Sequence, residues 1–457
     1  TNVNSKAEIL TNDNNNDDYK VCSGNIVNEK VTEYPKLDSG TSYTDEIEVP
    51  FTDANTNSNS TMTDKVCMYG DSTANIKEIG VIEDNTCKLQ GLKQNEKYYL
   101  RVCMKTSRGS YLCSNTESRS TLQVKKPTYT LSSNTLTIKY NNANIKGEAK
   151  YYFKSTIKGT SNINVKRCTL SNNIFTCDGN TTTIEKNIWY QSSSNQINIS
   201  YTTTGKVKVT ARTVDKSNNY SESTKDFTIN KYTITFNKGS ADKIGGEVSN
   251  ISKSCYAISG QSCSITSPDI EKKGYTIIGW NTNKNATTSI WNINTSKSIS
   301  SSATYYPILK ANIYTITLNN QGATSSGTKK VYYQYNTTKT INGTTCYYYT
   351  NSSLTTCLSG GYNINKPSKT GYSFKGYYTS TNGSGTNYVN SSGTFINNAY
   401  KTIGDKTLYA NWQANTYTIT YNANGGSGAP SSQSYTYDPN NDTVFYLSST
   451  TPSRSGY

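Results

Sequence analysis

The chain has 457 residues, too many for one hydrophobic core, and only 33% are hydrophobic, which predicts about three to five modest domains. Its net charge of +15 comes from lysines spread along the sequence without a basic-aromatic motif, which argues against specific nucleic-acid binding. The chain has no histidine, which excludes Ser-His-Asp and Cys-His catalysis and histidine-ligated metal sites, and it has no run of about 18 apolar residues to span a membrane.

Ten of the eleven cysteines fall in close couples along the chain. The couples are Cys67 and Cys87, Cys103 and Cys113, Cys168 and Cys177, Cys255 and Cys263, and Cys346 and Cys357, with Cys22 left over. No couple has the spacing of a zinc knuckle or redox motif, so disulfides across hairpins are the simplest interpretation. Such bonds predict an oxidising, extracytoplasmic setting. Free thiols are one alternative, and a bond from Cys103 to Cys67 is another.

Residues 1–35 are predicted to be the tail of an upstream module or a linker, with the partner of Cys22 lying before Thr1. Further on, Leu92 lies six residues before Tyr98. Tyr98 begins a predicted strand, residues 98–104, in which apolar side chains alternate with others. This spacing is typical of the tyrosine corner of β-sandwiches. On this corner and the strand periodicity, residues 36–126 resemble a fibronectin type III domain.

A second sandwich is predicted over residues 127–230. It begins with alternating apolar residues at 129–131 and 136–140, and it ends in a hairpin of 206–212 with 227–229. Bacterial immunoglobulin-like domains end similarly, so this segment resembles them.

The tetrapeptide Tyr-Thr-Ile-Thr occurs three times, at 232–235, 314–317 and 417–420, and each copy is followed by a proline and then by Gly-Tyr. The Gly-Tyr pairs are Gly274-Tyr275, Gly371-Tyr372 and Gly456-Tyr457. With the closing strand 408–412, Leu-Tyr-Ala-Asn-Trp, these residues resemble the internalin-type B repeat, or Listeria-Bacteroides repeat. The resemblance implies β-grasp-like modules on bacterial surface proteins. We therefore expect repeats at 231–312, 313–415 and 416–457, the last of them truncated.

Candidate chemistry is sparse. The segment 53–64 has part of the pattern of a calcium loop, but Ser58 stands where the sharp turn needs glycine, so an ordinary loop is the better interpretation, and no metal or cofactor is expected. Tyr347, Tyr348 and Tyr349 follow Cys346 in a polar hairpin and form a candidate contact loop, since displayed aromatics stack on sugars or anchor protein contacts. The alternative is that one or two of them pack on the sheet.

The sequence thus predicts an all-β chain of tandem modules, two sandwiches followed by β-grasp-like repeats, that is not an enzyme. We expect the stalk or adhesive region of a secreted protein at the bacterial cell surface or wall, contacting a cell-wall polymer, a host glycan or a surface protein. Two alternatives stay open: the binding and spacer region of a large secreted hydrolase, and a structural envelope subunit whose edge strands pair between chains.

Overall fold

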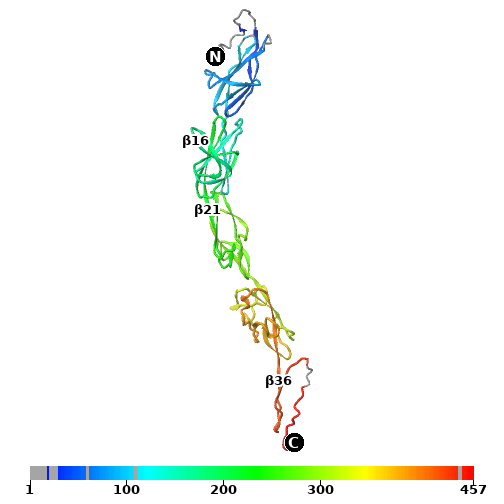
Figure 1. The fold of residues 1–457 in the computed structure, drawn as a ribbon. Helices are drawn as coiled ribbons and strands as arrows, with labels where there is room; N and C mark the ends of the chain where they lie inside the picture. Colours follow the sequence, from blue (N-terminus) through cyan, green and yellow to red (C-terminus); the bar gives the residue numbers. More distant parts are fainter. Residues whose placement is uncertain (1–17, 20–28, 58–60, 108, 110, 441–444) are drawn as a thin grey trace. The chain divides into compact units, whose positions relative to one another are not determined.

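The computed structural model of the chain describes residues 18–19, 29–57, 61–107, 109, 111–440 and 445–457 (Figure 1). These residues form an all-β protein, as predicted, with two short 3-10 helices, η1 (Thr381–Gly383) and η2 (Ala399–Lys401). No helix in this part of the chain is long and apolar enough to cross a membrane. The chain divides into two compact units. Unit 1 comprises Thr1–Thr233, Lys253–Ile265 and Ser298–Ser302, and unit 2 comprises Ile234–Ser252, Thr266–Lys297 and Ala303–Tyr457.

The first module of unit 1 is a sheet whose strands pair in the order β11-β10-β7-β8-β9-β5-β3, with β4 on β5 and β12 on β10. The strands are β3 (Lys36–Leu37), β4 (Thr41–Ser42), β5 (Glu46–Thr52), β7 (Met62–Gly70), β8 (Glu78–Glu83), β9 (Thr86–Gln90), β10 (Lys97–Thr106), β11 (Tyr111–Cys113) and β12 (Glu117–Ser120). Ile47 of β5 and Leu100 of β10 lie far apart in this order, yet both belong to one buried core. The sheet therefore folds over on itself as a sandwich.

Ahead of this sandwich, β1 (Asp18–Tyr19), β2 (Glu29–Glu33) and β6 (Asn55–Thr56) form a small sheet. Val31 of β2 stands opposite Thr56 of β6 and packs at the edge of the sandwich core. The end of the segment 1–35, which we predicted to be a tail or linker, is therefore held against the first sandwich.

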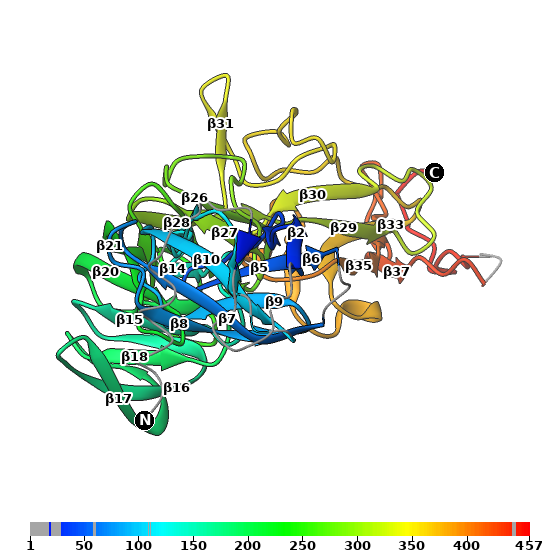
Figure 2. The same ribbon diagram turned by 90° about the horizontal axis from the view of Figure 1, so that it is seen from above.

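The second module of unit 1 pairs its strands in the order β13-β14-β19-β16-β18-β15-β20-β21, with β17 on β16. The strands are β13 (Thr128–Ser132), β14 (Thr135–Lys139), β15 (Lys150–Ser155), β16 (Gly159–Ser171), β17 (Ile174–Ile184), β18 (Trp189–Ser192), β19 (Gln196–Ser200), β20 (Gly205–Val214) and β21 (Tyr220–Phe236). Figure 2 shows β16, β17 and β18 side by side, in agreement with their pairing. Ile258, from the segment that the sequence assigns to the first repeat, lies in the core of this module.

The first repeat contains β22 (Lys243–Ile244), β23 (Ile251–Ile258), β24 (Cys263–Thr266), β25 (Ile270–Glu271), β26 (Tyr275–Asn281), β27 (Ser296–Ile299) and β28 (Ala303–Ala311). The second contains β29 (Ile313–Asn319), β30 (Lys330–Gln334), β31 (Lys339–Ile341), β32 (Thr344–Cys346), β33 (Tyr372–Tyr378), β34 (Asn387–Val389) and β35 (Lys406–Ala414). In the described part of the third, β36 (Thr416–Ile419) pairs with β37 (Gln433–Thr436).

The first two repeats share one strand arrangement within unit 2. In each, the strand that carries Tyr-Thr-Ile-Thr runs parallel to the closing strand, and the aromatic strand pairs antiparallel with that closing strand. The aromatic strand has a register shift at Gly279 in one repeat and at Gly376 in the other. Both glycines have positive φ, +131° and +122°, and a Cβ on either would lie closer than 3.0 Å to a backbone oxygen. The glycine of this strand is thus required by a bulge.

Candidate functional site

The ten coupled cysteines form five disulfides, each within a predicted couple. Cys103 stands opposite Cys113, and Cys168 opposite Cys177, in antiparallel register, so these two bonds cross hairpins as predicted. Cys22 lies outside the described residues.

The bond between Cys67 and Cys87 does not have the predicted cross-hairpin geometry. Cys67 is on β7 and Cys87 is on β9, and both strands pair with β8, which lies between them. Both cysteines are fully buried in the core. Gly80 of β8 explains how the bond passes, because a Cβ at that position would lie 3.2 Å from the sulfur of Cys67 and 2.9 Å from a backbone oxygen. A side chain on β8 would crowd the bond.

The candidate contact loop lies largely inside the second repeat. Tyr348 and Tyr349 are only 2% and 1% exposed, so these two do not form a displayed contact loop, and the alternative that one or two of the tyrosines pack inside is confirmed. The ring of Tyr348 stacks on Phe395 with centroids 4.0 Å apart, and its hydroxyl donates to the carbonyl of Asn397 at 3.0 Å. Tyr347 is partly buried. Because the other two rings are buried, at most Tyr347 is available for an external contact.

Tyrosine corners brace both sandwiches. In the first, the amide of Lys93 donates to the hydroxyl of Tyr98 at 2.9 Å, which confirms the predicted corner. In the second, the amide of Glu185 donates to the hydroxyl of Tyr190 at 2.8 Å, over the same interval of five residues. Our reading of the sequence missed this second corner. The signal was present, since Ile184 precedes Tyr190 by six residues, as Leu92 precedes Tyr98.

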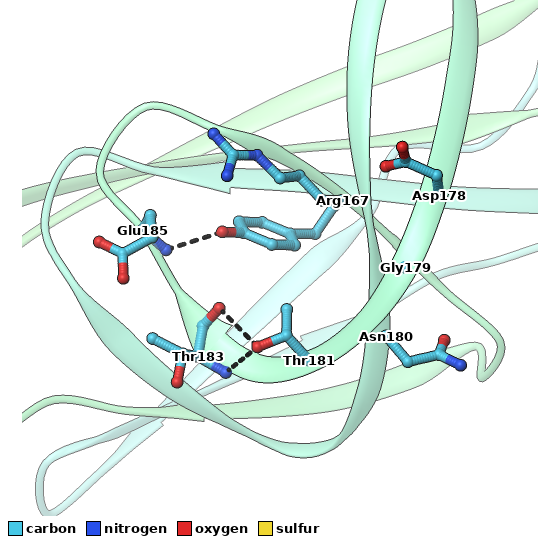
Figure 3. Close-up of a pocket in the computed structure, with 8 residues that line it drawn as sticks. Arg167, Asp178, Gly179, Asn180, Thr181, Thr183 and Glu185 are labelled. Carbon is cyan, nitrogen blue, oxygen red and sulfur yellow. Dashed lines mark hydrogen bonds between the residues drawn. The ribbon is translucent and has the colours of Figure 1, made fainter.

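A polar hollow of ≈ 330 Å³ lies beside the second corner, where β16 and β17 separate (Figure 3). Its lining consists of Arg167, Asp178, Gly179, Asn180, Thr181, Thr183, Glu185 and Tyr190. The pairing moves from Val165 and Thr181 to Arg167 and Asp178, so β17 carries one extra residue and bulges. In Figure 3, Arg167 and Glu185 lie on one side of the view and Asp178 on the other. The hollow therefore presents positively charged, negatively charged and neutral hydrogen-bonding side chains at the surface.

A second polar cluster joins the two sandwiches inside unit 1, and we call it the sandwich junction: Thr44, Asp45 and Glu46 of the first sandwich with Lys146 and the loop 215–219 of the second. The carboxylate of Glu46, only 1% exposed, accepts hydrogen bonds from Lys146 at 2.7 Å and from Lys216 at 2.8 Å.

Hydroxyl groups complete the sandwich junction. Thr44 donates to the carboxylate of Asp215 at 2.7 Å, and Ser217 donates to the carboxylate of Asp45 at 2.6 Å. The side-chain amide of Asn219 adds a bond to the carbonyl of Leu92 at 2.9 Å. These partners are more than 120 residues apart in sequence, so the loop 215–219 ties one sandwich to the other.

The environment of the junction separates the pKa values of its two neighbouring carboxyl groups. Burial raises the pKa of Asp45, and the nearby carboxylates of Asp215 and Glu46 raise it further, against the lowering effect of the Ser217 hydroxyl. Burial also acts to raise the pKa of Glu46, but the hydrogen bonds from two lysines outweigh burial and lower it. Shifted carboxyl groups mark catalytic sites as well as structural ones. Here both are buried and hydrogen-bonded between modules, which is typical of a structural joint.

Within the described residues, no three cysteine, aspartate or glutamate side chains gather closely enough to hold a metal ion.

Comparison with known proteins identifies a repeat domain in the first and third of the three repeats. Residues 232–307 and 417–457 match the Listeria-Bacteroides repeat domain, which confirms that resemblance. Residues 313–415 lie between the two matched segments, and they have the same strand arrangement as the first repeat. This repeat domain and the five disulfides together indicate an extracellular protein.

One curated relative, a protein of Evansella cellulosilytica described as a Gly-rich membrane protein, is 25% identical over 200 residues, which are 44% of this chain and 18% of the relative. The matched segment thus spans less than a fifth of that relative. Among solved structures, the fibronectin(III)-like modules of Clostridium thermocellum CbhA share 13% identity at a TM-score of 0.16, covering 42% of this chain and 92% of that chain. Chitinase ChiA74 from Bacillus thuringiensis shares 14% identity at a TM-score of 0.16, and the match covers 42% of this chain and 29% of the chitinase chain.

Proposed function

We propose that this chain is a non-catalytic part of a secreted bacterial surface protein, in which tandem β-modules act as a spacer and make contacts with the cell wall or with a host surface. The observation that supports this best is how the large side chains are used. Aromatic rings fill the cores of the modules, cysteines form disulfides within them, and a buried carboxyl group joins two successive modules. Repetition of similar small modules is what a spacer needs, because the length of the chain then grows by adding modules.

The net charge gives this region a means of weak contact. With a charge of +15, the chain is attracted to anionic wall polymers, and such attraction between exposed charges is screened beyond about 10 Å at 0.1 M salt. We expect binding that raises local concentration without specific recognition.

A second candidate function is recognition of a glycan at the polar hollow between β16 and β17. The bulge at Gly179 opens the hollow and sets a guanidinium, two carboxylates, an amide and three hydroxyls around it. Groups of this kind form hydrogen bonds with the hydroxyls of a sugar. Because donors and acceptors both line the hollow, they can fix the orientation of a bound sugar. Arg167 and Asp178 stand opposite each other in the strand register, which makes them the residues to vary.

Both proposals are tested by sedimentation of the purified chain with an anionic wall polymer and by a glycan array. For the spacer, we expect weak polymer binding that falls steeply with added salt, and no turnover of glycans, peptides or esters. Turnover that disappears on replacement of a single carboxylate would overturn the non-catalytic proposal. For the hollow, Arg167→Ala and Asp178→Ala should abolish any salt-resistant glycan signal, whereas Lys186→Ala, which removes an exposed charge next to Glu185 in sequence but is not part of the lining, should keep it. An unchanged signal in both lining variants would eliminate the hollow.

A further inference from the structure

Two consecutive linkers of unit 2 are held by the same set of hydrogen bonds. In the first, the amide of Asn312 donates to the carbonyl of Gly274 at 2.9 Å, and the amide of Tyr335 donates to the carbonyl of Asn312 at 2.9 Å. The hydroxyl of Thr276 donates to the side chain of Asn312 at 2.6 Å. Asn312 is therefore fixed on one side by the repeat before it and on the other by the repeat after it.

The second linker repeats these contacts with different residues. Asn415 donates to the carbonyl of Gly371 at 2.9 Å, and Tyr437 donates to the carbonyl of Asn415 at 2.8 Å. Ser373 replaces the threonine and donates to the side chain of Asn415 at 2.6 Å. The same hydrogen bonds thus occur in both linkers, and where a hydroxyl donor is needed, one linker uses threonine and the other serine. This agreement indicates a common joint between repeats.

Each joint also contains a pair of tyrosine rings. Tyr335 meets Tyr275 edge to face, with centroids 5.8 Å apart and planes at 83°. Tyr437 meets Tyr372 in the same way, at 5.5 Å and 86°. Edge-to-face contacts of this kind stabilise a pair beyond the area it buries. The rings also lie over the neighbouring glycine: a Cβ at Gly274 or Gly371 would be closer than 3.0 Å to ring carbons.

The glycine belongs to a tight turn that begins with a basic residue. The turns start at Lys272, Lys369 and Arg454, and in each the amide of the tyrosine three residues later donates to the carbonyl of the basic residue. Gly274, Gly371 and Gly456 have φ values of +79°, +78° and +83°. The basic side chain lies over the ring of the tyrosine at 5.8, 4.5 and 4.6 Å. The turn at Arg454 thus has the same backbone geometry as the other two.

We propose that the Lys/Arg-x-Gly-Tyr turn of a repeat is a docking surface whose partner is the next repeat, through its linker asparagine and the tyrosine that follows its second strand. Glycine is needed there for two reasons, since the φ is positive and the incoming ring occupies the space of a side chain. The joint restricts the angle between neighbouring repeats, and the Gly-Tyr of the repeat sequence thus encodes contact between modules in addition to the fold of each. This inference stands whether or not the chain acts as a spacer.

The test uses the full chain with Gly371→Ala and Tyr437→Leu. Gly343→Ala is the matched control: it lies in the same repeat with a φ of +82°, so it carries the same backbone strain, but no atom lies within 4 Å of its Cβ. Tyr437 is absent from the core of the second repeat, so Tyr437→Leu removes the ring without disturbing that core. Two measurements are made: cleavage at 412–418 by a protease of broad specificity under native conditions, and the α-proton shift of Gly371 in glycine-labelled protein.

We expect Gly371→Ala and Tyr437→Leu to speed cleavage at 412–418 roughly tenfold, because local cleavage follows the population of open joints. Tyr437→Leu should also remove the ring-current shift of Gly371. Gly343→Ala should change neither measurement. Equal cleavage of Gly343→Ala and Gly371→Ala would assign the effect to backbone strain and overturn the joint. An unchanged Gly371 shift in Tyr437→Leu would overturn it as well, even if Gly371→Ala unfolds.

Discussion

Replacing Tyr348 by alanine should destabilise the second repeat, whereas replacing its neighbour Tyr347 should have a small effect. Tyr348 is 2% exposed, stacks on Phe395 and meets Tyr333 edge to face. Burial raises the pKa of its phenol well above the usual range, so the hydroxyl stays protonated and donates to a backbone carbonyl. Tyr347 is partly exposed and packs at the border of the core, where its ring meets those of Tyr362 and Tyr400 edge to face, the nearer at 5.2 Å.

The size of the effect follows from what the truncation removes. Loss of a buried aromatic side chain costs about 3–5 kcal/mol, including the cavity left behind, and the stacked and edge contacts place Tyr348→Ala in the upper part of this range. For the partly exposed Tyr347, a loss of about 1 kcal/mol is expected. Since small domains are stable by only about 5–15 kcal/mol, the first change alone removes a large share of the stability of the repeat.

Hydrogen exchange followed by mass spectrometry on the intact chain measures this difference locally. Peptides covering β29, β33 and β35 should lose roughly 10³-fold protection or somewhat more in Tyr348→Ala and less than about tenfold in Tyr347→Ala. Peptides from the two sandwiches serve as an internal reference and should not change. If both variants lose the same protection, Tyr348 is not a core residue and the reasoning from its burial fails.

Three further predictions concern unit 1 and the disulfides. Peptide mapping without reduction should recover the five bonds within the predicted couples, and a bond between Cys67 and Cys103 would contradict the structure. Tyr190→Phe should cost about 1–2 kcal/mol, seen as faster exchange around the second corner, because it leaves the Glu185 amide without its acceptor; unchanged exchange would show that water replaces the hydroxyl. Because the folded-state pKa of Glu46 is lowered, its contribution to stability is present above its ordinary value of 4.5 and is lost as the pH falls through the folded value. Glu46→Gln should therefore cost roughly 1–3 kcal/mol near neutral pH and progressively less as the pH falls below 4.5, measured by urea unfolding, and a cost independent of pH would contradict the assignment.

Local spacing was enough to predict much of this protein. The apolar residue six positions before Tyr98 predicted a corner that the structure contains, and the couple of Cys103 and Cys113 predicted a bond that the strand register allows. Both features join residues close in sequence, so the alternation of side chains along a strand and the length of the turn determine whether they meet. The repeats were recognisable for the same reason, since a bulge or a tight turn needs glycine at a fixed place.

Other features depended on which residues the folded chain brings together. Tyr348 follows a disulfide in a polar segment and looks like a displayed ring, but Phe395, 47 residues later, covers it. The bond between Cys67 and Cys87 passes β8 because Gly80 leaves room there. The carboxylate of Glu46 meets Lys216 across 170 residues, and no local pattern records that pairing. Whether a polar or aromatic side chain is exposed is decided by the partner that packs against it, and that partner is known only once distant strands are in place.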